Sequence, residues 1–276
     1  MDRIVALKVA SVGEQSLDPQ RLSHRPAWML NKSLRDSMEV VLYYASGHST
    51  MHQMKFMDAG QNRIAFSSLN SAIVLKMNPS DAKSHNREEW NLYNSSSVLF
   101  QEVIPRVYGL GLIKLGLEQY DGLVCERIAF TVERIFNIIC RKPATPASIS
   151  YVTVITEEVL KLLVYAGHVC QKHCRDWHTQ NLALQDGDEL KVKLIAWADH
   201  SDAPWSKTRD RIRNAYQAFM SYYANVDMNP DWRNIFTDLE AKIREWWRVD
   251  STDMNTLHLE NLIRTIPPKT GRRSQR

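Results

Sequence analysis

Two stretches near the middle of the chain gather the residue types that bind ions or move protons. The first, HCRDWHTQNLAL, runs from His173 to Leu184 and places Asp176 five residues before Asn181, with His178 between them. The second, KLIAWADH, runs from Lys193 to His200. Carboxylate and amide oxygens can orient a hydroxyl group or ligate a hard cation, so the first stretch is a candidate site for such chemistry.

The spacing of Asp176 and Asn181, with the apolar LAL run after them, resembles the catalytic loop of the protein-kinase-like superfamily. The resemblance implies that Asp176 accepts or orients the substrate hydroxyl and that Asn181 holds a magnesium ion. The form D-x-H-x-x-N and the tryptophan at Trp197 are closer to aminoglycoside phosphotransferases and other atypical kinases than to ordinary protein kinases. The chain has no long activation segment ending in APE, so we do not expect regulation through such a segment.

The second stretch resembles the strand that carries the metal-binding aspartate of this superfamily, but Ala196 stands at the acidic position. An alanine cannot bind a cation, and losing that carboxylate should cost several kcal/mol of transition-state stabilisation. Three explanations stay open. The protein is a natural pseudokinase, or Asp199 or Asp202 supplies the metal ligand from a shifted register, or the chain carries a deliberate change from aspartate to alanine.

A lysine and a glutamate further upstream fit the same resemblance. Lys76 ends the β-rich run SAIVLKM, and Glu88 and Glu89 follow about a dozen residues later on a predicted helix. In the superfamily a strand lysine paired with a helix glutamate holds the α- and β-phosphates of the nucleotide. We predict that Lys76 and Glu89 form this pair, Glu89 being preferred over Glu88. The alternative is an exposed lysine near a solvated acidic turn.

Two further segments are implied to contact the nucleotide. Residues 53–57 and 63–67 predict a hairpin whose turn would lie over the phosphates, and only Gly60 is available there to let the backbone approach closely. The run VCERI resembles the end of the strand that leads into the hinge of a kinase. Glu126 to Ile128 are therefore the predicted contact with adenine, made by backbone groups.

The cysteines and histidines before Asn181 allow another interpretation. The run HVCQKHCRDWH could hold a structural zinc ion through His168, Cys170, His173, Cys174 and His178. No second ligand pair at zinc-finger spacing occurs elsewhere in the sequence, so we favour loop residues and a buried thiol. Four cysteines in 276 residues do not indicate a disulfide framework.

The composition excludes several protein classes. Hydrophobic residues make up 44% of the chain and charged residues 24%, which is ordinary for a globular protein and excludes a disordered or fibrous one. No apolar run reaches the roughly 18 residues of a membrane span, and the N-terminus is a poor secretory signal. We therefore predict an intracellular protein, with a secreted effector as the alternative. The net charge of +4 is mild, and we do not expect a nucleic-acid partner.

Together these patterns predict an α+β, two-lobed, protein-kinase-like fold with a small antiparallel sheet and a larger helical lobe. The expected division is an extension over 1–50, an N-lobe over 51–128, a helical C-lobe over 129–268 and a basic tail over 269–276. The predicted function is ATP-dependent phosphoryl transfer to a hydroxyl group of a protein or small molecule. ATP and Mg²⁺ are the expected cofactors if the site is intact. The alternative is an inactive pseudokinase that binds a partner.

Overall fold

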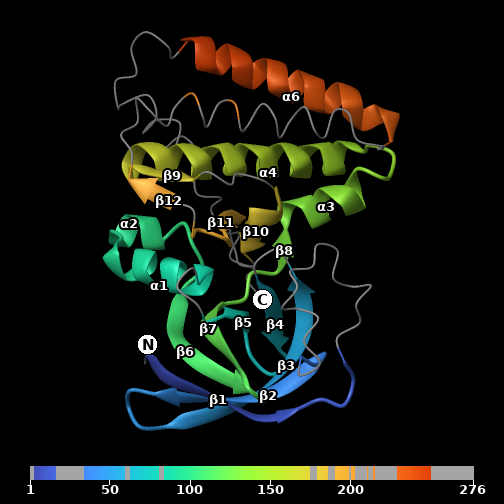
Figure 1. The fold of residues 1–276 in the computed structure, drawn as a ribbon. Helices are drawn as coiled ribbons and strands as arrows, with labels where there is room; N and C mark the ends of the chain where they lie inside the picture. Colours follow the sequence, from blue (N-terminus) through green and yellow to red (C-terminus); the bar gives the residue numbers. More distant parts are fainter. Residues whose placement is uncertain are drawn as a thin grey trace, which may run out of the picture.

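A curled antiparallel sheet forms the part of the molecule that precedes residue 127 (Figure 1). The structure is a computed structural model and describes residues 3–16, 34–59, 63–80, 84–174, 179–185, 190–198, 200–202, 210, 214 and 229–249. The sheet has seven strands in the order β1-β2-β3-β4-β5-β7-β6, and all neighbours are antiparallel. The strands are β1 (Ile4–Val12), β2 (Ser37–Tyr44), β3 (Ser49–Ala59), β4 (Ile64–Ser68), β5 (Ile73–Pro79), β6 (Val107–Leu115) and β7 (Glu118–Glu126).

One face of this sheet is apolar because side chains alternate along each strand. In β4, Ile64 and Phe66 are fully buried, and in β5, Leu75 and Met77 are fully buried beside them. These residues belong to one core cluster with apolar side chains from β1, β2, β3, β6 and β7. The residues between them, Lys76 among them, therefore point to the opposite face of the sheet.

The sheet curls until its first strand lies against its last one. A Cβ atom at Gly109 in β6 would come within 2.6 Å of the carbonyl oxygen of Ile4 in β1. A Cβ atom at Gly111 would collide with the side chain of Leu7. Glycine at these two positions lets the backbones approach closely, and the enclosed apolar face becomes a core.

Helices α1 and α2 come between β5 and β6, and the remaining helices and short strands follow β7, with α3, α4 and α6 beyond one end of the sheet in Figure 1. The helices are α1 (His85–Ser95), α2 (Val98–Gln101), α3 (Val132–Ile139), α4 (Pro146–Val164) and α6 (Pro230–Val249). The short strands are β8 (Phe130–Thr131), β9 (Lys172–Cys174), β10 (Leu182–Gln185), β11 (Lys191–Leu194) and β12 (His200–Asp202). They form a β11-β10-β8 sheet and a β12-β9 pair.

A second core joins the outer face of the large sheet to these helices. It contains Val74 of β5 and Leu123 of β7 together with Phe136 of α3, Val159 of α4 and Trp232 of α6, all buried. The apolar stripe on α4 has the helical spacing that the sequence shows, so this helix packs along its length. The second core holds the elements after residue 130 against the strand that carries Lys76.

The predicted combination of an antiparallel sheet and helices is confirmed. The β6–β7 hairpin turns at Gly116, whose φ of +62° suits glycine. Thr145 caps α4 by accepting a hydrogen bond from the Ser148 N–H. Gly167 follows the end of α4 and lies within the π-helical turn Tyr165–Val169.

Two other expectations concern the chain as a whole. Among the described residues, no helix is long and apolar enough to cross a membrane. The strands β1 and β2, which come from the predicted N-terminal extension, are hydrogen-bonded into the same sheet as the strands after residue 50. The division into extension, lobes and tail, and the intracellular location, stay predictions.

Candidate functional site

Lys76 projects from the middle of β5, between two neighbouring strands. It pairs with Ala65 of β4 and with Leu123 of β7. Because Leu75 and Met77 enter the apolar core of the curled sheet, Lys76 points to the other face, toward α1. Only 9% of the residue is exposed, so its ammonium group needs partners within the protein.

Helix α1 is fixed to this face of the sheet by its own polar residues. Ser84 caps the helix by accepting from the Arg87 N–H, and its hydroxyl donates to Oδ1 of Asn78 at 3.2 Å. One turn in, the amide of the fully buried Asn86 donates to the backbone carbonyls of Lys76 (2.8 Å) and Asp121 (2.7 Å). These bonds tie the helix to β5 and β7, and residue 89, three positions on, faces the same side.

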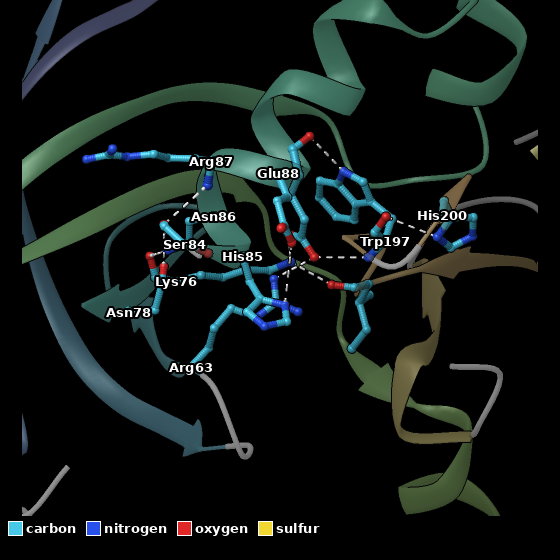
Figure 2. Close-up of polar contacts among 12 residues, drawn as sticks. Arg63, Lys76, Asn78, Ser84, His85, Asn86, Arg87, Glu88, Trp197 and His200 are labelled. Atoms are coloured by element: carbon cyan, nitrogen blue, oxygen red, sulfur yellow. Dashed lines mark hydrogen bonds and ion pairs between the residues drawn. The ribbon is translucent and has the colours of Figure 1, made fainter. Parts of the chain in front are cut away.

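Glu89 is fully buried at the centre of a charge cluster, and Figure 2 labels three of its neighbours, Arg63, Lys76 and Trp197. Its Oε2 is 3.0 Å from Nζ of Lys76, and its Oε1 is 2.5 Å from Nη1 of Arg63. The backbone N–H of Trp197 donates to Oε1 at 2.9 Å. Burial on its own would raise the pKa of Glu89, but the charges of Arg63 and Lys76 and the hydrogen bonds lower it to about 2. The carboxyl group is therefore ionised at neutral pH.

The segment after Asn181 closes over Lys76 from the other side. Nζ of Lys76 donates to the carbonyl of Ile195 at 2.5 Å and lies 4.3 Å from the centre of the Trp197 ring. The fully buried Trp197 also donates from Nε1 to the carbonyl of Glu89 at 3.0 Å. The N–H of Ile195 donates to the carbonyl of Asn181 at 2.9 Å. The segment is thus bonded to both α1 and the turn that carries Asn181.

The structure brings the predicted Lys76–Glu89 ion pair together. Glu89, and not Glu88, meets Lys76: the Glu88 side chain is 52% exposed and lies 4.0 Å from Nδ1 of His85. The alternative of a solvated lysine beside an acidic turn is wrong, since both members of the pair are buried. What the pair does chemically stays a prediction.

Several predicted site residues lie outside the described residues, namely Gly60, Asp176 and Asp199. Asn181 ends a 3₁₀ turn directly before β10, and Ala196 is half-buried between Ile195 and Trp197. No metal role can be assigned to either from these positions. The alternative zinc cluster around Cys170 also falls partly outside the described residues, since His178 is not among them.

The predicted contact with adenine, Glu126 to Ile128, ends β7 and already carries hydrogen bonds. The N–H of Glu126 donates to the carbonyl of Arg106, and the N–H of Arg127 donates to the carbonyl of Ala72. The carboxylate of Glu126 accepts from Gln185 at 2.9 Å. These bonds use the backbone N–H groups of Glu126 and Arg127, and the contact with adenine stays a prediction.

The magnesium site stays a prediction, and Ala196 contributes no ligand to it. Mg²⁺ prefers oxygen ligands that include carboxylates, and Ala196 offers a methyl group. Among the described residues, no group of three or more His, Cys, Asp or Glu side chains is placed to hold a metal. The side chain of Asp202 is 85% exposed and pairs with Lys172 at 2.5 Å, which argues against the alternative ligand register through Asp202.

Sequence reasoning missed three residues that build the cluster. Asn86 anchors α1, Arg63 gives Glu89 a second cation, and Trp197 covers Lys76. Trp197 was noted only as a family marker. A signal for Arg63 does exist: it lies two residues before Ala65, the residue that pairs with Lys76, and residues two apart on a strand share a face.

Comparisons with known proteins add little to this description. No protein-family model matches the chain, and no curated protein matches it. Among solved structures, it is similar to WaaP in complex with acyl carrier protein, with 15% sequence identity and a TM-score of 0.43. That similarity covers 76% of this chain and 89% of the other. A likeness of this size does not establish a shared fold or activity.

Proposed function

We propose that this protein is a kinase-like phosphotransferase that moves a phosphoryl group from ATP to a hydroxyl of a protein or small molecule. One observation carries the proposal: a buried strand lysine, Lys76, is ion-paired with a helix glutamate, Glu89, beside the segment that follows Asn181. In kinase-like enzymes a pair of this kind positions the nucleotide phosphates. The two-lobed arrangement, the antiparallel sheet as one lobe and the helices as the other, is part of the proposal.

Three residues would have distinct roles in the transfer. Glu89 holds the ammonium of Lys76 in place, and Lys76 binds phosphate oxygens. Lysine has three N–H donors, and Lys76 uses two of them for Glu89 and the carbonyl of Ile195. Because Nζ also lies against the Trp197 ring, a phosphate oxygen would take the place of the Ile195 carbonyl. Asp176 would orient the acceptor hydroxyl, whose oxygen bonds to the γ-phosphorus as the bond to the leaving diphosphate breaks. The hydroxyl proton passes to the Asp176 carboxylate.

Magnesium, if bound, would be held by the two predicted ligands, Asn181 and Asp199, and Ala196 would supply none. Asn181 lies in the described turn before β10, and Asp199 lies outside the described residues. The metal would neutralise charge on the phosphates, and no step of the transfer is assigned to it.

A second candidate is a pseudokinase that binds a partner without transferring phosphate. Two observations favour it. Ala196 stands where the superfamily has an acidic residue. In addition, Lys76 is already enclosed by protein groups, namely the Ile195 carbonyl and the Trp197 ring. A lysine with this set of partners is stable without a nucleotide.

Two measurements separate the candidates. Thermal unfolding with and without ATP and Mg²⁺ reports binding, since a ligand that binds the folded state raises the melting temperature. A radiolabelled ATP transfer assay on wild type, Ala196→Asp and Lys76→Met then reports chemistry. A phosphotransferase should transfer label, more strongly in Ala196→Asp and not in Lys76→Met. Stabilisation by ATP without transfer in wild type and Ala196→Asp would instead support the pseudokinase.

A further inference from the structure

The cluster around Glu89 carries more positive charge than negative charge. Two cations, Arg63 and Lys76, contact a single carboxylate, that of Glu89. The side chains are largely buried, with 18% exposed for Arg63, 11% for Lys76 and none for Glu89. Burying a positive charge without a negative partner costs free energy. Because the cluster has one positive charge more than negative charges, a bound anion would neutralise it.

The strand register explains why Arg63 reaches this cluster. Ala65 of β4 pairs with Lys76 of β5, and Arg63 stands two residues before Ala65, directly before the strand begins at Ile64. Its guanidinium contacts Oε1 of Glu89, whereas Lys76 contacts Oε2. The two cations therefore flank one carboxylate, one on each oxygen, and Figure 2 shows their side chains converging on the same point.

The two cations differ in what they can still donate. The ammonium of Lys76 serves Glu89 and Ile195, and its remaining side faces the Trp197 ring. Arg63 has five N–H donors in a planar fork, and its contact with Glu89 uses one nitrogen, Nη1. A planar fork of donors matches the oxygens of a phosphate better than a point charge does. Arg63 is thus the better placed of the two to receive an anion.

On the opposite side of the site, alanine stands at position 196, where the resemblance expects a metal-binding carboxylate. Ala196 has no ligand atom, and the described residues contain no cluster of side chains suited to a cation. We propose that Arg63 binds the phosphates of a nucleoside di- or triphosphate in place of a divalent metal, so that the site takes the free nucleotide without Mg²⁺. This inference rests on the proposed nucleotide site and adds Arg63 as a second cation that contacts the phosphates.

The test is calorimetric titration of ATP into the full chain, in EDTA and in excess Mg²⁺. Wild type should bind in EDTA at least as tightly as with Mg²⁺, because the metal neutralises phosphates that Arg63 would bind. Arg63→Gln should weaken binding in EDTA by tenfold or more, while Glu89 keeps Lys76 as its partner. Arg233→Gln on the exposed side of α6 makes the same change of charge and should leave the affinity unchanged.

If Arg63→Gln does not fold, the conservative variant Arg63→Lys tests the same inference. Arg63→Lys keeps the ion pair with Glu89 but loses the fork, and several-fold weaker binding in EDTA is expected. Wild-type affinity in either Arg63 variant, or binding that requires Mg²⁺, would overturn the inference and leave the proposed function standing. No ATP binding by wild type or Ala196→Asp in either buffer would overturn both.

Discussion

The two sides of the candidate site are built from different chemistry. On the sheet side, Arg63 and Lys76 share the single carboxylate of Glu89, which leaves one positive charge in excess. On the other side, residues 194–197 contribute backbone carbonyl and N–H groups and one indole ring. The described part of that side has no carboxylate near Lys76.

This difference separates two functions that usually come together in a kinase-like site. The sheet side holds its charges in position before any ligand arrives, since α1 is fixed by Asn86 and Glu89 is fully buried. Such preorganisation lowers the cost of binding an anion. The other side covers and orders the lysine without offering a metal ligand. Under the proposed function, phosphate binding would depend on the sheet side and metal binding on the other side, and the following tests compare the two sides.

The largest effect is expected at Glu89. Glu89→Gln leaves two buried cations without their counter-charge, which should lower the free energy of unfolding by about 3–5 kcal/mol. Urea unfolding followed by circular dichroism measures this loss. Glu88→Gln is the matched control, because that side chain is half exposed, and its effect should stay within about 0.5 kcal/mol. Equal stabilities of the two variants would show that the charged side does not depend on its carboxylate.

The same carboxylate predicts how stability depends on pH. Its pKa is about 2 in the folded protein against an ordinary value of 4.5. A lowered pKa means that the folded state favours the ionised form, so the stabilisation is complete above the ordinary pKa and is lost as the pH falls toward about 2. The stability difference between wild type and Glu89→Gln should therefore be constant near neutral pH and shrink below about 4.5. A difference that grows on acidification would contradict the charge cluster.

A moderate effect is expected on the uncharged side. Trp197→Phe removes the indole N–H that bonds the carbonyl of Glu89 and leaves a small void, which should cost about 1–3 kcal/mol. Trp232→Phe is a matched control, since its buried indole donates to the carbonyl of Lys142 at 2.8 Å. Both variants should lose similar stability, but only Trp197→Phe should speed hydrogen exchange in α1. The same rate of hydrogen exchange in α1 of both variants would mean that the Trp197 indole does not stabilise this helix.

The smallest effect is expected at the edge of the charged side. Arg87 of α1 pairs with Asp121 at 2.7 Å, but 48% of the Arg87 side chain is exposed. Water screens such a pair, so Arg87→Gln should cost about 1 kcal/mol or less by urea unfolding. A loss as large as that of Glu89→Gln would place the anchoring of α1 in this outer pair and not in the buried cluster.

Much of the fold follows from local patterns that the sequence displays. The alternation around Leu75 and Met77 predicts a strand whose other face carries Lys76, and the spacing of apolar residues over 152–166 predicts α4. The choice of Glu89 over Glu88 came from resemblance and helical spacing, and the structure places Glu89 on the buried side. The turn near Gly116 was missed because strand periodicity continues on both sides of it.

The sequence by itself determined the alternation of apolar residues along the strands and the residues that cap the helices. It also determined that residue 196 is an alanine. Only the tertiary structure decided that Arg63 and Trp197 join Lys76 at Glu89. Arg63 arrives through the pairing of β4 with β5, and Trp197 arrives from more than a hundred residues away in the chain. Contacts of this kind depend on strand register and on the packing of distant segments, and no periodicity within a short window encodes them.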